Sequence, residues 1–430
     1  MNVISFFTPV RTVTCVLIFI LMSCSSSGTK KDPQMKPSFS KGSYGYDVDF
    51  LTRNNFKFIE LKDEQGIARI LIVPDLQGRV MTSSANGREG KSFGWINYSY
   101  IESGKKNDQF NPFGGEERLW LGPEGGDYSI YFKEGSEQVF SNWQVPKELD
   151  TEPFDIISQN THSISFKKAF SLVNASGTSM QIGLERKVSL MSSEEVGDAL
   201  KLNIDDSLKL VAYESYNTLI NQGESAWNAQ SGFLSLWLLS MFNPSSEGVV
   251  CIPIRMGPES ELGKLVNDEY FGKVPADRLK ISEDAILFKT DGAYRSKIGV
   301  SSRRALQWSL AYDPANKALT LLWYSDPEQD GPYVNSKWGK QDDPLVGDVI
   351  NSYNDGPTED GSVMGPFFEI ESSSPAAMLA PGERLTHIQR IFHFTGNEDK
   401  LNEITLHLAN TSIDELKGAF KQDSKTQNLK

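Results

Sequence analysis

The sequence predicts an all-β protein, a large antiparallel β-sandwich with short C-terminal helices. Apolar and polar residues alternate with period two in many short segments, and turn residues separate these segments. Helical periodicity is nearly absent between Gly42 and Ser245, where the pattern is strand after strand. Because no helix is expected there to carry parallel crossovers, packed antiparallel sheets are favoured.

Strands are expected wherever this alternation is clearest. These segments are residues 56–61, 68–74, 162–166, 180–190, 249–254, 285–288, 310–312, 318–324 and 367–371. The end of the chain differs, because residues 398–408 carry apolar side chains at helical spacing. Ser412 and Glu415 have the spacing of a capping box, so two short helices should close the domain.

The first residues have the character of a secretion signal. Arg11 is followed by an apolar run, residues 13–22, which is too short to span a bilayer permanently. The ending Leu-Met-Ser before Cys24 resembles a bacterial lipobox, in which the cysteine becomes the lipidated first residue. A plain secretory signal that contains a cysteine is the alternative. Ser25 is, by analogy, typical of outer-membrane sorting, so we expect a signal peptide over residues 1–23 and a lipid-anchored protein of the cell envelope, in the outer membrane.

Composition sets further limits. Residues 24–41 are rich in Ser, Lys, Pro and Gly and should form a flexible tether. The net charge of −13 argues against nucleic acid as a partner, so contact with the membrane is expected through the lipid on Cys24. Cys251 would then be the one unmodified cysteine of the mature chain, which excludes a disulfide framework. We expect one β-sandwich domain over residues 42–396 and a helical extension over residues 397–430.

Residues 111–132 are the densest stretch of polar and aromatic residues. Five glycines and two prolines require tight turns there. Charged side chains beside flat aromatic rings suit a sugar, which is polar at its edge and apolar on its face. A structural turn whose acids face water is the alternative. The predicted substrate-binding residues of this stretch are Glu116, Glu117, Arg118, Trp120 and Glu124.

Three motifs resemble the galactose mutarotase (aldose 1-epimerase) superfamily. They are Asp-Leu-Gln-Gly-Arg-Val-Met at residues 75–81, Glu-Arg-Lys-Val-Ser-Leu at 185–190, and Leu-Ala-Pro-Gly-Glu-Arg-Leu-Thr-His at 379–387. Residues 114–124 and 221–227 are more similar to uncharacterised lipoprotein branches of the superfamily. The resemblance covers most of the chain after the tether, and it implies a concave sheet that binds carbohydrate.

The resemblance also implies carboxylate acid/base chemistry. Mutarotation needs a base for the anomeric hydroxyl proton and an acid for the ring oxygen. In the superfamily the base is a Glu on a strand before the Pro-Gly-Glu turn, which matches either Glu369 or Glu371 here. Strand alternation puts both on the face opposite Phe368 and Ile370, where two like charges would raise one pKa. A solvated strand face is the alternative.

The acid departs from the superfamily pattern. Epimerases use a histidine in an Asn-His-Thr-Tyr type of motif, and the corresponding residues 221–227 contain none. His387, after the Pro-Gly-Glu turn, is the histidine that could reach the cleft. The candidates for the acid are therefore Glu116, Glu117, Glu124 and His387.

Other polar clusters complete the predicted site. Arg295 and Lys297 fall on one strand face and suit a carboxylated or phosphorylated sugar, with surface solvation as the alternative. A turn rich in hydrogen-bonding groups and a second turn near Trp237 offer more contacts, although core packing is the default for the tryptophans. The further predicted substrate-binding residues are Asn221, Trp227, Tyr353 and Asn354.

No cofactor or metal is expected. Five aspartates between residues 326 and 348 could hold calcium, but they lack EF-hand spacing. The sequence has no P-loop, dinucleotide fingerprint, serine-hydrolase elbow or zinc motif. Two hypotheses remain: an enzyme that acts on carbohydrate by carboxylate acid/base chemistry, such as a sugar isomerase, and a non-catalytic glycan-binding lipoprotein that uses the same cleft.

Overall fold

The computed structural model describes residues 38–282, 284–327, 331–358 and 360–421, which belong to one compact unit. The predicted signal peptide, Cys24 and most of the predicted tether lie outside the described residues, as do residues 422–430. Within the described ranges, none of the helices is both long enough and apolar enough to cross a bilayer.

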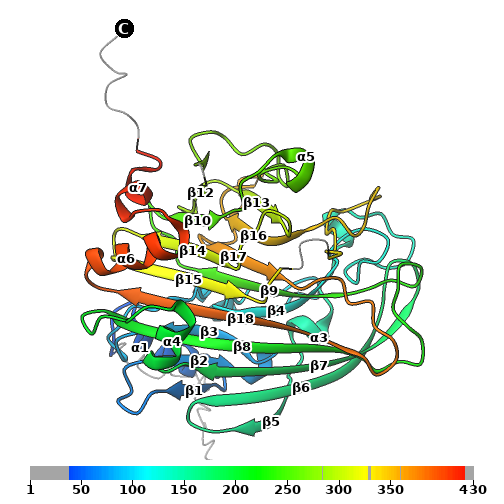
Figure 1. The fold of residues 1–430 in the computed structure, drawn as a ribbon. Coiled ribbons are helices and arrows are strands. Elements are labelled where there is room, and N and C mark those ends of the chain that lie inside the picture. Colours follow the sequence, from blue (N-terminus) through cyan, green and yellow to red (C-terminus); the bar gives the residue numbers. More distant parts are fainter. Residues whose placement is uncertain (1–37, 283, 328–330, 359, 422–430) are drawn as a thin grey trace, which may run out of the picture. The chain divides into compact units, whose positions relative to one another are not determined.

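Three antiparallel sheets build the described part of the chain (Figure 1). The ten-stranded sheet contains, in spatial order, β11 (Leu279–Ile281), β12 (Ala285–Lys289), β10 (Val249–Pro253), β14 (Trp308–Asp313), β15 (Ala318–Tyr324), β18 (Arg384–Thr395), β8 (Lys209–Asn221), β7 (Ser179–Leu190), β6 (Ser163–Val173) and β5 (Asp155–Gln159). The five-stranded sheet contains β13 (Ser296–Ser301), β16 (Asp348–Asn354), β17 (Phe368–Ser373), β9 (Ser235–Phe242) and β4 (Arg118–Gly122). The three-stranded sheet contains β1 (Ile59–Lys62), β2 (Arg69–Val73) and β3 (Arg79–Ser84).

The main core joins inward-facing apolar residues of the five-stranded and ten-stranded sheets, including Leu238 and Ile370 from the first and Val188 and Val211 from the second. A second core covers the other face of the ten-stranded sheet, and a third packs against the three-stranded sheet. The helices are α1 (Tyr44–Arg53), α2 (Tyr98–Ser103), α3 (Lys147–Asp150), α4 (Ser193–Leu200), α5 (Glu259–Leu262), α6 (Glu398–Ala409) and α7 (Ile413–Gly418), with 3-10 turns η1 (Pro74–Leu76) and η2 (Phe140–Asn142).

The predicted fold class is confirmed: the sheets are antiparallel and short helices follow the last strand. The predicted segment 318–324 coincides with β15, and the capping box between Ser412 and Glu415 forms at the start of α7. Leu401 and Ile404 of α6 and Leu416 of α7 enter the second core, so the C-terminal helices cover the ten-stranded sheet (Figure 1).

The expectation that helices are nearly absent between Gly42 and Ser245 is wrong at α1 and α4. Ser43 caps α1 by accepting a hydrogen bond from the Tyr46 N–H, and α1 buries Val48 and Leu51. Ser192 forms a complete capping box with Glu195 at the start of α4. Both helices are short, and their caps rather than a long apolar period mark them in the sequence.

Candidate functional site

Strand β17 places its two glutamates on one face of the five-stranded sheet. Phe368 and Ile370 join the main core, and Glu369 and Glu371 point the other way, as strand alternation predicts. The register sets Glu369 between Met241 of β9 and Tyr353 of β16, and Glu371 between Leu239 and Asn351. The glutamates therefore stand at the centre of the sheet, with two strands on either side of β17.

Cations from the outer strands meet these carboxylates. Arg118 Nη2 of β4 lies 3.3 Å from Glu369 Oε1, and Lys297 Nζ of β13 lies 2.8 Å from Glu371 Oε2. The indole Nε1 of Trp237 donates a second hydrogen bond to Glu371 Oε2 at 2.9 Å. The surface carrying these five side chains is termed the glutamate face below.

Burial sets the protonation of the glutamate face. It raises the pKa of Glu369 to about 8, with the Glu371 charge adding to the effect and Arg118 opposing it. Burial also raises the pKa of Glu124 to about 7, although Lys297 pulls in the opposite direction. For Lys297 burial works to lower the pKa, but Glu371 and the other carboxylates outweigh it and hold that pKa above its usual value. At neutral pH the face thus holds a protonated carboxyl group beside a charged ammonium group.

Several polar atoms on and near this face have no hydrogen-bond partner within the described part of the chain. They are Glu371 Oε1, Arg118 Nε and Trp120 Nε1, and all of them are buried. Their side chains are neighbours, since the Arg118 guanidinium lies 4.1 Å from the Trp120 ring centroid and Trp120 contacts Trp237, which donates to Glu371. Buried polar groups in native proteins are nearly always bonded, so these atoms are the ones that a polar ligand would bond.

Aromatic rings enclose the glutamate face. Trp120 makes an edge contact with Trp237 at 5.7 Å, and Trp143 stacks on Tyr131 at 6.1 Å and on Trp338 at 6.3 Å. As a result Glu369 is 7% exposed and Glu371 is 1% exposed. In this conformation the glutamate face is covered.

The segment 335–341 forms part of this cover. It packs on the Gly-Pro-Glu-Gly-Gly turn at residues 122–126, where the Glu124 N–H donates to Ser336 Oγ at 3.3 Å. A Cβ on Gly125 would lie 2.4 Å from the Lys337 carbonyl oxygen, so only glycine permits this approach. The turn chemistry of the glycine-rich stretch therefore positions the cover over Glu124.

The side chains of the glycine-rich stretch, residues 111–132, lie on both sides of the five-stranded sheet. Arg118 and Trp120 lie beside the glutamates, and Glu124 is close enough for Glu371 and Lys297 to shift its pKa. Glu116 and Glu117 instead lie in the interior, where Glu116 contacts His393 at 3.0 Å and Glu117 contacts Arg186 at 2.8 Å. Glu117 precedes Arg118, and alternation sends their side chains to opposite faces.

His387 also lies away from the glutamates. Its Nε2 is 2.8 Å from Ser372 Oγ, and Ser372 follows Glu371 and faces the interior. Burial lowers the pKa of His387 to about 3, so the ring is neutral at physiological pH. The structure therefore does not bring His387, Glu116 or Glu117 together with Glu369 and Glu371, and Glu124 is the candidate acid that it does bring there.

Tyr353 and Arg295 lie together near Glu369, whereas the Asn354 side chain does not. Tyr353 is the neighbour of Glu369, and its hydroxyl lies 3.3 Å from Nε of the exposed Arg295, whose guanidinium is 4.0 Å from the Phe271 ring centroid. Asn354 instead bonds the turn at Gly292 and Tyr294.

The last two predicted residues, Asn221 and Trp227, lie at the end of β8 and just after it. Asn221 Nδ2 donates to the Leu379 carbonyl at 2.8 Å, and the Trp227 N–H donates to the same carbonyl at 2.9 Å. Asn221 and Trp227 fasten a connection, and neither contacts a glutamate of the β17 pair in the described contacts.

Residues 42–420 match the model of a family of unknown function, DUF6786. The chain belongs to this family. A search of curated proteins finds no match to the chain.

Several solved structures are distantly similar to this chain. A protein of Synechocystis covers 80% of this chain and 97% of its own, with 12% identity and a TM-score of 0.47. A galactose mutarotase-like protein of Lactobacillus casei covers 78% and 100%, with 10% identity and a TM-score of 0.43. A galactose mutarotase related enzyme of Lactobacillus acidophilus covers 79% and 97%, with 10% identity and a TM-score of 0.42.

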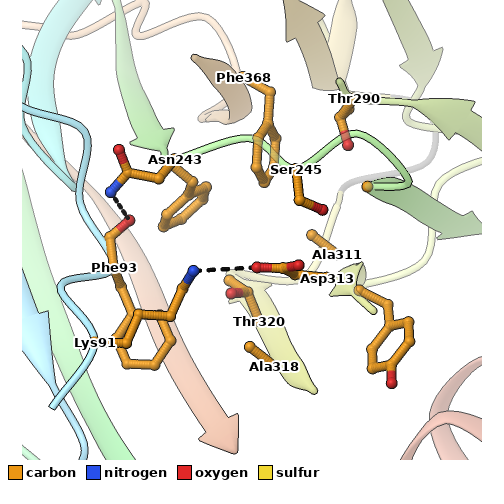
Figure 2. A pocket seen from close by; sticks show the side chains of 13 residues that line it. Lys91, Phe93, Asn243, Ser245, Thr290, Ala311, Asp313, Ala318, Thr320 and Phe368 are labelled. Carbon is orange, nitrogen blue, oxygen red and sulfur yellow. Dashed lines mark hydrogen bonds and ion pairs between the residues drawn. The ribbon is translucent and has the colours of Figure 1, made fainter. Parts of the chain in front are cut away.

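Two hollows of the protein lie away from the glutamate face. A hollow of about 20 Å³ is crossed by the ion pair of Lys91 and Asp313 at 3.1 Å (Figure 2). Phe368 of β17 and Phe93, from the segment between β3 and α2, line it, and it has room for a single water. A groove of about 350 Å³ lies beside α4 and is lined in part by Glu214 and Arg390. Neither lining includes Glu369 or Glu371.

Sequence reasoning missed most of the aromatic enclosure. Trp143 and Trp338 lie in long connections between strands, and no spacing in the sequence links them to each other or to β17. A usable signal is the Gly-Gly pair at residues 125–126, which predicts that another segment approaches the backbone closely. Among the described residues, no group of three or more His, Cys, Asp or Glu side chains could hold a metal ion.

Proposed function

We propose that the glutamate face binds a carbohydrate and transfers protons to and from it. The supporting observation is the pairing of a carboxyl whose pKa is about 8, Glu369, with a cation-held carboxylate, Glu371, inside an aromatic enclosure. Such a pair supplies an acid and a base at neutral pH from two adjacent groups. Rings beside unbonded N–H groups suit the apolar face and the hydroxyl edge of a sugar.

The roles follow from the contacts of each group. Glu371 is the candidate base, because Lys297 and Trp237 occupy its Oε2 and its Oε1 has no partner among the described residues. Glu369 is the candidate acid, because it holds a proton at neutral pH, and Glu124, with a pKa of about 7, is the alternative acid. In a ring opening, the base would take the anomeric hydroxyl proton as the acid protonates the ring oxygen, and reclosure on the other face would reverse both transfers.

Arg118 and Lys297 serve this chemistry through charge. Lys297 neutralises the Glu371 carboxylate, and Arg118 opposes the rise of the Glu369 pKa and would stabilise that carboxylate once its proton has left. Because both cations contact glutamates, the exposed Arg295 beside Tyr353 is the candidate to bind a carboxylated or phosphorylated group on the sugar.

Entry of a sugar requires movement of the cover. With Glu371 only 1% exposed, a ligand reaches it when the segment 335–341 moves off the turn at Glu124. Closure over a bound ligand would then exclude water from the proton transfers.

The proposal includes attachment to the cell envelope. The apolar run and the lipobox-like ending at Cys24 support a lipid anchor, and Ser25 supports the outer membrane as the destination. Growth of cells expressing the chain with a labelled fatty acid tests this, and the label should be absent from the Cys24→Ser variant. Equal labelling of both proteins would contradict the anchor.

The catalytic part is tested with residues 38–430 and a panel of neutral hexoses, hexuronates and sugar phosphates. A bound sugar should raise the melting temperature, and polarimetry or NMR should show faster interconversion of its anomers. Glu369→Gln and Glu371→Gln should slow that interconversion by about a hundredfold or more. The matched control is Glu185→Gln on β7, whose carboxylate is 48% exposed.

Each outcome separates the hypotheses. Retained affinity with no anomer interconversion in the wild type would identify a non-catalytic glycan-binding protein. No stabilisation by any sugar of the panel, together with no interconversion, would contradict the proposed function.

A further inference from the structure

An exposed ring continues the aromatic enclosure to the surface. Phe140 of η2 is 68% exposed, and it stacks on the buried Trp143 with ring centroids 6.0 Å apart and planes at 17°. The Trp143 ring centroid lies 6.3 Å from that of Trp120, which lies 5.7 Å from that of Trp237. The Trp237 indole donates a hydrogen bond to Glu371. The four rings form a continuous row from solvent to the glutamate face, termed the aromatic row below.

The exposure of Phe140 is fixed by its backbone. The Asn142 N–H donates to the Val139 carbonyl at 2.9 Å, and the Trp143 N–H donates to it at 3.2 Å. The Phe140 carbonyl accepts a hydrogen bond from Gln109 Nε2, and the Asn142 side chain donates to the Glu137 carbonyl at 2.9 Å. The turn is therefore held in place with the phenyl ring outward.

Single exposed apolar side chains are common and carry no message alone. Phe140 differs because one side of its ring is stacked on the aromatic row and the rest meets water. Its neighbours along the chain include the exposed polar residues Glu137, Ser141 and Asn142, beside Val139, which is 38% exposed. A flat apolar surface with a polar rim is what the C–H face and the hydroxyl edge of a sugar unit require.

We propose that Phe140 is a stacking position for an outer sugar unit, and that the carbohydrate handled at the glutamate face contains at least two linked units. This inference rests on the proposed function and names the class of its ligand, an oligosaccharide or glycoside. One unit occupies the glutamate face, and a unit further along the saccharide stacks on the solvent end of the aromatic row, because three ring spacings of 6.0, 6.3 and 5.7 Å separate Phe140 from Trp237. A free monosaccharide would leave Phe140 uncovered.

The test measures affinity by calorimetry for sugar series of one to four units, using D-glucose with cello- and malto-oligosaccharides and D-galactose with linear galacto-oligosaccharides. In the bound series, the unit that reaches Phe140 should raise the wild-type affinity about tenfold, because it adds a buried stacking contact. Phe140→Ala should remove most of that gain and leave the monosaccharide affinity unchanged. The matched control is Tyr216→Ala on β8, which removes a 44% exposed ring from the ten-stranded sheet.

The outcomes distinguish this inference from the proposed function. Binding of monosaccharides with no gain from any added unit, or an oligosaccharide affinity that Phe140→Ala and Tyr216→Ala leave equally unchanged, would overturn the inference and leave the proposed function standing. Absence of binding to every member of every series would remove both. Equal melting temperatures of the two variants and the wild type would show that the comparison is made on folded protein.

Discussion

Two pairs of buried glutamates in this chain have opposite surroundings. Glu116 and Glu117 lie between the sheets, where Glu117 contacts Arg186 at 2.8 Å and Gln389 at 2.7 Å. Glu369 and Glu371 lie on the other side of the five-stranded sheet, where Glu371 Oε1 has no partner among the described residues. Both pairs are nearly inaccessible, so burial alone does not separate a structural acid from a functional one.

The difference is clearest between Glu117 and Glu371, since Glu116 Oε2 also has no partner among the described residues. Both oxygens of Glu117 have partners on two strands of the ten-stranded sheet, Arg186 of β7 and Gln389 of β18, and Arg186 is itself bonded to Asn217 at 2.6 Å. Such a network leaves no site for a ligand, and its loss would leave a charge buried without a counter-charge. The glutamate face keeps unbonded atoms and a carboxyl with a pKa of about 8, which are features of a site that awaits a ligand.

The largest expected effect comes from the interior pair. Glu117→Gln leaves the fully buried Arg186 without its counter-charge and should lower the free energy of unfolding by about 3–5 kcal/mol. Urea denaturation at pH 7 measures this. At the same pH, Glu369→Gln should cost far less, because Glu369 is already mostly protonated. Equal losses in the two variants would remove the contrast between the pairs.

The second effect is a pH dependence of stability. Because the pKa of Glu369 is about 8 when folded and near 4.5 when unfolded, the folded state binds the extra proton between these values. Stability is therefore lost as pH rises, by about 2 kcal/mol between pH 6 and pH 8 for this group. Subtracting the Glu369→Gln unfolding curve from that of the wild type should isolate the loss. A difference that does not change over this pH range would contradict the raised pKa.

A smaller effect is expected at the cover. Gly125→Ala places a methyl group against the Lys337 carbonyl and should cost about 1 kcal/mol while displacing the segment 335–341. Trp143 and Trp338 should then become more accessible, which acrylamide quenching of tryptophan fluorescence measures. Gly104→Ala is a useful comparison, because its Cβ would meet nothing within 4 Å, although its φ of 61° adds local strain. Equal quenching in both variants and the wild type would show that the segment is not displaced.

The smallest effect is expected at the surface. Glu185 and Arg384 form an ion pair at 3.5 Å with side chains 48% and 57% exposed. Glu185→Gln should change the free energy of unfolding by less than about 0.5 kcal/mol, since solvent screens such pairs. A loss of more than 1 kcal/mol in the urea titration would mean that glutamate substitutions perturb this fold regardless of burial.

The sequence predicted the parts of the site that depend on local pattern. Period-two alternation in residues 367–371 puts Glu369 and Glu371 on one face, opposite Phe368 and Ile370, which the register confirms. The same rule could not place Glu116 and Glu117, because they precede the strand and their partners are remote. Arg186 is 69 residues from Glu117 and Gln389 is 272 residues away, so only the packing of the two sheets shows that these groups meet.

The positions of residues in or next to loops also could not be predicted from the sequence. Glu124 was selected from its turn, but its pKa is raised mainly by burial and then modified by Lys297 and Glu371, which come from distant strands. His387 was selected from the Pro-Gly-Glu turn before it, yet β18 turns it toward Ser372 in the interior. Residue type and neighbouring motif suggested a role for each residue. The side of the sheet on which the side chain lies decided whether it could take that role.

The central claim is that a carboxyl group of the glutamate face keeps its proton at neutral pH. Carbon-13 NMR of the chain labelled at glutamate carboxyl carbons tests it directly, with the Glu369→Gln variant used for assignment. One resonance should titrate near pH 8 and be missing from that variant. Titration of every glutamate below about pH 5, close to the value for unperturbed groups, would contradict the account.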